Sequence, residues 1–219
     1  MDTDALIRHL SSTVTPVAPL GSPRARTWRW LAGSAAYLAV LAAVMSLRGD
    51  LATRVQEPRF LLEQVAALLT GGLAAGVALA TTIPGYSRRL PLLVLPPALV
   101  WIGAVVWGWL ADIGGLGAAS PPLEADWGCV ATILAGSAFP AIALARMLRR
   151  GVPLSPHLTA ALGALGAAGV GNVGICLFHP HTSNLVILVW HCGSVLALAL
   201  LVGATGGWWL RWSEGFEVR

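Results

Sequence analysis

Charged residues are scarce in this chain of 219 amino acids, and lysine is absent altogether. Only 11% of the residues are charged, whereas an ordinary soluble domain has roughly 25%. No polar stretch approaches the roughly 100 contiguous residues that a separate soluble catalytic or DNA-binding domain needs. The composition therefore argues against a soluble globular protein, and the sequence leaves no room for a separate soluble domain. We expect no direct contact with nucleic acid.

Hydrophobic residues make up 56% of the sequence, and they gather in six long runs. A helix needs about 20 residues to cross a bilayer whose hydrocarbon core is about 30 Å thick. The runs are long enough, and short segments rich in glycine, proline and charge separate them. We therefore predict an all-α polytopic membrane protein with six transmembrane helices in an antiparallel bundle. The runs cover residues 28–47, 61–83, 90–111, 128–147, 158–178 and 184–209.

Arginine is divided unequally between the two sides that six spans create. If the N-terminus is cytoplasmic, that side holds eleven of the 14 arginines. Because positively charged loops stay in the cytoplasm, we predict that both termini are cytoplasmic. The expected organisation is a cytoplasmic partner-binding segment over residues 1–27, a transmembrane domain over 28–212 and a cytoplasmic tail over 213–219.

Two other residue types have a regular placement in the predicted spans. Eight tryptophans lie near span ends, where an indole ring suits the headgroup region, and we interpret them as interface anchors. Small residues recur at four-residue spacing, as in Gly163, Ala167 and Gly171, which indicates close helix packing and leaves a homodimer open. The eight tryptophans are Trp28, Trp30, Trp107, Trp109, Trp127, Trp208, Trp209 and Trp212.

The segment before the first run contains a short amphipathic pattern. Asp2 or Thr3 can cap a helix that runs to about Val14, and Pro16 ends it. An isolated helix of about 12 residues is marginal in water, so its apolar stripe needs a surface to lie on. That surface could be the membrane, another part of the chain or a cytosolic protein, and the nearly neutral polar face lets a partner protein compete with lipid. The candidate binding residues are Asp4, Leu6, Ile7, Leu10 and Val14.

Three cysteines are too few for a disulfide framework, although one pair could form a bond on an oxidising side. The predicted topology gathers thiols and imidazoles in the outer half of the bundle. Thiolate and imidazole bind thiophilic metals, and neighbouring cysteines can be oxidised to a disulfide. The spacing matches no zinc motif, and a buried cysteine commonly acts as a small hydrophobe, so packing is the alternative for each residue. The candidate sensing residues are Cys129, Cys176, His179, His191 and Cys192.

Carboxylates also lie near the outer ends of the predicted spans. Glu63, Asp112 and Asp126 are placed there by the same topology. A carboxylate at membrane depth is costly and suggests a function, whereas one at the interface is simply solvated. Both interpretations are open from the sequence.

Five short motifs occur in order along the chain: Glu57-Pro58-Arg59-Phe60-Leu61-Leu62-Glu63, Pro84-Gly85, Asp126-Trp127-Gly128-Cys129, Arg149-Arg150-Gly151 and Trp190-His191. Together they resemble the NrsF-like six-helix anti-sigma factors of proteobacterial inner membranes. The resemblance runs from about Asp4 to Trp212, and the Asp-Trp-x-Cys element is its most specific part.

This resemblance implies a function that composition alone does not show. Members of the family hold an extracytoplasmic-function sigma factor inactive at the membrane, with the cytoplasmic N-terminal segment taking part. They release the sigma factor under a stress such as heavy metal, and two periplasmic cysteines are implicated in sensing it. The resemblance therefore predicts a non-enzymatic regulator of the inner membrane with no obligatory cofactor, for which a thiophilic metal ion is a transient signal.

The chain departs from the family at the second of these cysteines. Cys129 matches the first, whereas Phe178-His179-Pro180 stands where the family has a His-Cys-Pro element. His179 could replace the thiol as a metal ligand, Cys176 could substitute from the preceding turn, or the stimulus could differ. The alternative function is a small metal or solute transporter or a heme-handling membrane protein. The scarcity of polar groups at the centres of the runs argues against it.

Overall fold

The computed structural model describes residues 2–14, 19–116, 127–178 and 184–210, apart from the side chains of Thr13 and of residues 115–116 and 127–129. Within these ranges the chain forms helices and no strand. A 3₁₀ turn, η1 (Leu90–Val94), precedes α5, and a π-helical segment, η2 (Ile187–Cys192), joins α8 to α9. The α-helices are α1 (Thr3–Thr13), α2 (Pro23–Met45), α3 (Leu51–Arg54), α4 (Pro58–Ala80), α5 (Leu95–Leu116), α6 (Trp127–Leu148), α7 (Pro156–Ile175), α8 (Asn184–Val186) and α9 (Gly193–Trp209).

Six helical stretches in the described part of the chain are long and apolar enough to cross a membrane, with mean hydropathy from 1.3 to 2.5. This confirms the six predicted spans, with ends shifted by a few residues. The first helix differs most, because α2 begins at Pro23 and not near residue 28. Ser22 caps it by accepting a hydrogen bond from the Ala25 amide at 3.3 Å, and proline suits the first helical position.

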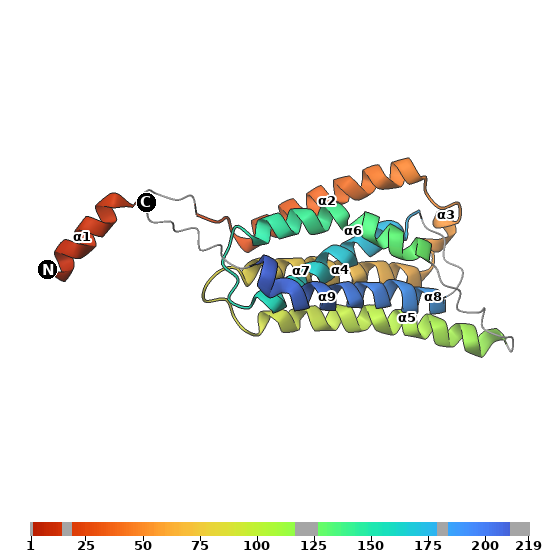
Figure 1. Ribbon diagram of the computed structural model, residues 1–219. Coiled ribbons are helices and arrows are strands. Elements are labelled where there is room, and N and C mark those ends of the chain that lie inside the picture. Colours follow the sequence, from red (N-terminus) through yellow and green to blue (C-terminus); the bar gives the residue numbers. More distant parts are fainter. Residues whose placement is uncertain (1, 15–18, 117–126, 179–183, 211–219) are drawn as a thin grey trace.

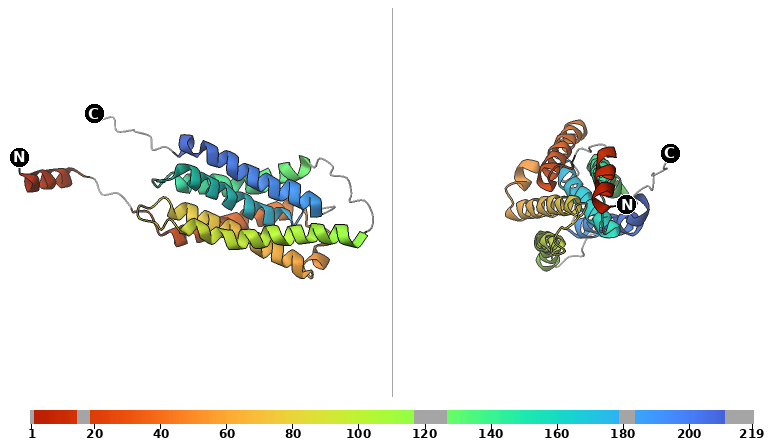
Figure 2. Two further views of the ribbon diagram at one scale, coloured as in Figure 1. Left: turned by 90° about the horizontal axis from the view of Figure 1, so that it is seen from below. Right: turned by 90° about the vertical axis from the view of Figure 1, so that its left-hand side faces the viewer.

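The six long helices lie along one another in an elongated bundle (Figure 1). At one end, which we call the Thr82 end, Arg26 at the start of α2 donates hydrogen bonds to Thr82 Oγ1 (3.3 Å) and to the Met147 carbonyl oxygen. At the other, the Asp50 end, the Arg48 amide donates to the Leu177 carbonyl oxygen at 3.0 Å. These bonds join segments that are far apart in the sequence. Helix α1 is drawn apart from the bundle (Figure 2).

Helix α7 is the most enclosed of the six, with 72% of its span buried against 22% for α2 and α9. It packs against α4, α6 and α9. Glycines permit this approach, because a Cβ atom added at Gly171 would lie 2.9 Å from the Ser137 nitrogen, and one at Gly166 would lie 2.9 Å from the Ala75 nitrogen. These small residues therefore serve contacts within the chain. A homodimer stays a prediction.

Trp30 is not an interface anchor, so the prediction was wrong for this residue. Its side chain is 2% exposed, and its Nε1 donates to the Pro140 carbonyl oxygen at 2.8 Å. The position of Trp30 near a span end did not reveal that α6 packs against this side of α2. Trp28, Trp107 and Trp208 are exposed, as expected of anchors.

Candidate functional site

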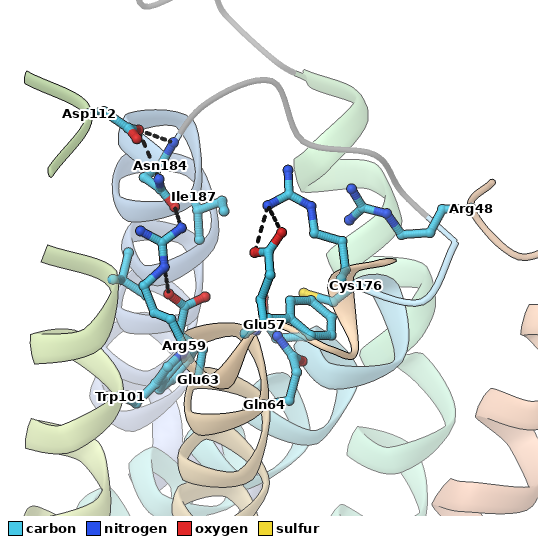
Figure 3. Close-up of a pocket in the computed structure, with 14 residues that line it drawn as sticks. Arg48, Glu57, Arg59, Glu63, Gln64, Trp101, Asp112, Cys176, Asn184 and Ile187 are labelled. Atoms are coloured by element: carbon cyan, nitrogen blue, oxygen red, sulfur yellow. Dashed lines mark hydrogen bonds and ion pairs between the residues drawn. The ribbon is translucent and has the colours of Figure 1, made fainter. Parts of the chain in front are cut away.

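A polar pocket of about 190 Å³ lies at the Asp50 end (Figure 3). Charged groups at the edge of an apolar bundle are costly unless they are paired or solvated. The pocket is therefore the place in the bundle where side-chain chemistry concentrates. Its polar lining consists of Arg48, Arg54, Glu57, Arg59, Glu63, Gln64, Asp112, Asn172, Cys176 and Asn184.

One rim of the pocket is a cluster of ion pairs around α3. Arg48, whose side chain is 3% exposed, holds Asp50 with two contacts, Nε to Oδ1 at 2.5 Å and Nη2 to Oδ2 at 2.8 Å. The hydrogen bond from Arg48 lowers the pKa of the Asp50 carboxyl to about 2. Arg54 contacts Asp50 at 3.4 Å and Glu57 at 3.1 Å. Because the Arg48 contact is two-pronged, it fixes the orientation of the loop that carries α3.

A second chain of contacts crosses the pocket from α4 to α5. Arg59 Nε lies 3.5 Å from Glu63 Oε1, and Arg59 Nη2 donates to Asn184 Oδ1 at 3.3 Å. Asn184 Nδ2 in turn donates to Asp112 Oδ2 at 2.8 Å. The chain therefore couples α4, α8 and α5. The Glu63 side chain is 8% exposed, so simple solvation at the interface does not explain this carboxylate.

Cys176 lies in the wall of the pocket, directly after the last residue of α7. Its side chain is buried, and burial raises the pKa of the thiol to about 12. Figure 3 shows Gln64 beside Cys176, and a hydrogen bond from the Gln64 side chain lowers the pKa of the thiol, against the effect of burial. The thiolate is the form that binds metal and attacks disulfides. In this conformation burial therefore disfavours the reactive thiolate form of Cys176.

His191 and Cys192 belong to the π-helical segment η2. His191 is fully buried, and its Nδ1 donates to Asn172 Oδ1 at 2.7 Å. Asn172 also lines the pocket, so it connects the imidazole to the pocket wall. Cys192 is half-buried and packs against an apolar cluster that includes Val195. π-helical turns are rare in proteins, and those that do occur are often found at functional sites.

The structure brings only part of the predicted sensing site together. Cys176 lines the pocket and His191 reaches it through Asn172, whereas Cys192 packs against an apolar cluster. Cys192 is a free thiol. Among the residues that the structure describes, no group of three His, Cys, Asp or Glu side chains could hold a metal ion.

The side chains of two members of the predicted site are not described. Cys129 falls in the first turn of α6, but its side chain is not described, and His179 lies wholly outside the described residues. The five-residue metal site consequently stays a prediction.

Helix α1 confirms the short helix predicted before the first span. Its apolar stripe faces outward, with Leu6 39%, Ile7 58% and Leu10 55% exposed, and Val14 after the helix is 68% exposed. Asp4 lies in the first turn, where a negative charge is favourable beside the positive end of the helix dipole. The described residues therefore leave the stripe exposed, so that another surface can contact it.

Sequence reasoning missed the amide side chains of the pocket. Gln64, Asn172 and Asn184 are polar residues at the ends of otherwise apolar runs, and that position was the available signal. The outer arginines were counted only for topology. The four-residue spacing of Arg59 and Glu63, which places both on one helix face, was the signal for their pairing.

The protein is therefore an all-α polytopic membrane protein with a pocket of paired charges at one end and an exposed amphipathic helix ahead of its first span. The family model NrsF, described as negative regulator of sigma F, matches residues 10–212. The chain belongs to this family, and the resemblance inferred from the motifs is confirmed. The family is one of regulators and is not a class of enzymes.

A curated relative supports the same assignment. The anti-sigma-F factor NrsF of Caulobacter vibrioides (strain NA1000 / CB15N) is 31% identical over 97% of this chain and 100% of its own length. No solved structure matches the chain. The motif from Glu57 to Glu63, which contributed to the resemblance, forms the start of α4, and Glu57, Arg59, Phe60 and Glu63 from it line the pocket. Four of the fourteen residues that line the pocket thus come from a segment that contributed to the resemblance.

Proposed function

We propose that this protein is an anti-sigma factor of the bacterial inner membrane. It binds an extracytoplasmic-function sigma factor through α1 and releases it when a periplasmic metal or oxidative signal is sensed. The observation that carries this proposal is the exposed stripe of Leu6, Ile7 and Leu10 on a helix ahead of the first span, in a family of negative regulators of sigma F.

The stripe suits a protein groove better than it suits a membrane surface. Helices that lie on membranes are usually rich in basic residues on their polar face, whereas α1 carries Asp4, Arg8 and His9 and is nearly neutral. Residues spaced as Leu6, Ile7 and Leu10 form one face of a helix, which is the pattern of a helix laid into an apolar groove. The sigma factor would supply that groove.

The proposed topology places α1 where a sigma factor can reach it. Successive spans run in opposite directions, both termini are cytoplasmic, and the Thr82 end faces the cytoplasm. The uneven distribution of arginine supports this orientation, since Arg88, Arg89, Arg149 and Arg150 then lie in cytoplasmic loops. The Asp50 end, with its pocket, faces the periplasm.

The proposed sensor lies around the pocket at the Asp50 end. A thiophilic metal ion would be a signal there and not a resident cofactor, bound by Cys129 with Cys176, His179, His191 or Cys192. Such a bridge would tie the outer ends of α6 and α7 to η2. If the bundle has two packings, the bridge shifts their balance, and the cytoplasmic face loses its partner.

Co-purification of the sigma factor from membranes tests the binding step. The full-length chain with Leu6→Ser, Ile7→Ser and Leu10→Ser should retain at most about one tenth of the sigma factor, a loss of about 1.4 kcal/mol or more in binding free energy. The matched control, Arg8→Ala with Ser12→Ala, changes the polar face of the same helix and should bind normally. Undiminished binding by the triple variant would remove α1 from the interface.

Induced release tests the sensing step separately. Cys129→Ala should bind the sigma factor as the unaltered chain does, yet fail to release it on exposure to cadmium or a thiol oxidant. A variant that still responds fully would exclude Cys129 as the sensor, while leaving the binding step intact.

A further inference from the structure

A groove of about 1040 Å³ lies between α2 and α6 at the Thr82 end. The two helices are in contact and run side by side (Figure 1). The lining changes character along the groove. Arg26, Arg29 and Arg150 stand toward the helix ends, whereas Gly33 and Phe139 line its deeper part.

The three arginines form a concentration of positive charge. No acidic residue is found among the described residues that line the groove. Arg26 is 3% exposed, and the neutral oxygens of Thr82 and Met147 accept its hydrogen bonds. The charges of Arg29 and Arg150 act on it, and both of these side chains are exposed. Uncompensated guanidinium groups favour an anion, and phosphate matches their geometry.

The depth of the groove distinguishes a lipid from a soluble anion or a cytosolic protein. Gly33 lies ten residues after Pro23, which is about 15 Å along the helix. Phe139 lies nine residues before Leu148, or about 14 Å. Both reach roughly the middle of a hydrocarbon core about 30 Å thick. An acyl chain can follow an apolar groove to that depth, whereas a soluble protein cannot.

Specific contacts hold the two walls of the groove together. The Trp30 indole donates to the Pro140 carbonyl oxygen at 2.8 Å, and the Tyr37 hydroxyl donates to the Ala135 carbonyl oxygen at 2.7 Å. The rings of Tyr37 and Phe139 stack with centroids 5.3 Å apart. The groove is therefore formed before any ligand arrives, which reduces the cost of binding.

We propose that this groove binds an anionic phospholipid from the surrounding bilayer. The lipid phosphate lies against Arg29 and Arg150 beside the buried Arg26, and one acyl chain runs between α2 and α6 past Gly33 and Phe139. The positive charge at the mouth of the groove matches the anionic headgroup of a phospholipid, and the apolar walls below it match an acyl chain. Basic pockets between membrane helices hold anionic headgroups in this way.

Native mass spectrometry of the full chain in a neutral detergent tests the proposal, with phosphatidylglycerol and phosphatidylcholine as probes. The unaltered chain should retain phosphatidylglycerol and not phosphatidylcholine. Arg29→Gln with Arg150→Gln should weaken phosphatidylglycerol binding about tenfold or more. Arg88→Gln with Arg89→Gln removes the same charge from exposed loop positions and should change binding less than about twofold. Equal losses in both pairs would overturn the site.

Two further variants separate headgroup charge from groove shape. Arg29→Lys with Arg150→Lys keeps the charge and should retain most of the phosphatidylglycerol binding, which excludes misfolding as the cause of the loss. Gly33→Leu leaves every charge in place but fills the deep part, since a Cβ there already lies 3.5 Å from the Phe139 ring. It should also reduce binding. Undiminished binding by Gly33→Leu would overturn the acyl-chain position.

Competition distinguishes the remaining occupants. Inorganic phosphate at millimolar concentration should leave phosphatidylglycerol bound, because it cannot replace the acyl-chain contacts. Complete displacement would identify a free-phosphate site and overturn the lipid assignment. Displacement of the lipid by purified sigma factor would identify the groove as a protein interface and would overturn it equally.

Discussion

His191 of η2 donates a hydrogen bond from Nδ1 to Oδ1 of Asn172 in α7, across 2.7 Å, and both side chains are buried. The contact joins the π-helical start of the last span to the central helix of the bundle. Because Asn172 also lines the pocket, a rearrangement of the pocket that moves Asn172 would disturb its hydrogen bond to η2. The pair is therefore well placed to couple the Asp50 end to α9.

Substitution of Asn172 should destabilise the folded chain. Asn172→Ala removes the buried acceptor, and loss of such a hydrogen bond costs about 1–3 kcal/mol. The control is Thr205→Ala, since the exposed Thr205 hydroxyl bonds only within its own helix, to Leu201 and Val202. Thermal unfolding in detergent, followed by circular dichroism, should show a lower Tm for the first variant alone. Equal Tm values would contradict a structural role for the pair.

Close packing of α7 predicts a second stability difference. Gly171→Ala would place a Cβ 2.9 Å from the Ser137 nitrogen, so α6 must move away. Gly103→Ala is the matched control, because a Cβ there meets nothing within 4 Å, and alanine favours a helix over glycine by about 1 kcal/mol. The first variant should unfold at a lower temperature and the second should not. An unaltered Tm for Gly171→Ala would refute the close approach.

The spans and the tail helix could be predicted because their causes are local. Length and composition determine roughly where each span lies in the chain, and the spacing of Leu6 and Leu10 reveals a one-sided stripe. The pairing of Arg59 with Glu63 is also local, since four residues on a helix share a face.

The contacts that complete the pocket and the groove were not predictable in the same way. Asn184 and Asp112 are separated by 72 residues, and Trp30 and Pro140 by 110. Topology assigns each residue to a side of the membrane and a depth, but it does not give the rotation of each helix about its own axis. That rotation decides whether Trp30 faces lipid or α6.

Burial of Cys176 predicts slow alkylation of its thiol. Burial raises its pKa to about 12, so at pH 8 only about one thiol in 10⁴ is ionised, and the reactive fraction grows as the pH rises. One chain carries Cys129→Ser and Cys192→Ser, so that Cys176 is its only cysteine. The comparison chain lacks Cys176 as well and carries Thr53→Cys at an exposed position. A maleimide should label Cys176 much more slowly than the thiol at position 53. Equal rates at pH 8 would show that the pocket opens readily.

Site-specific photo-cross-linking can locate the bound sigma factor on α1. A photoreactive phenylalanine analogue is introduced in place of Ile7 on the apolar stripe, or in place of Ser12 on the opposite face of α1, and the membranes are irradiated with the sigma factor present. If the sigma factor binds the apolar stripe, we expect a cross-link to it from position 7, a much weaker one from position 12, and loss of the position 7 cross-link after induction. A sigma factor that co-purifies with the membranes but cross-links to neither position, or equally to both, would contradict binding through the stripe.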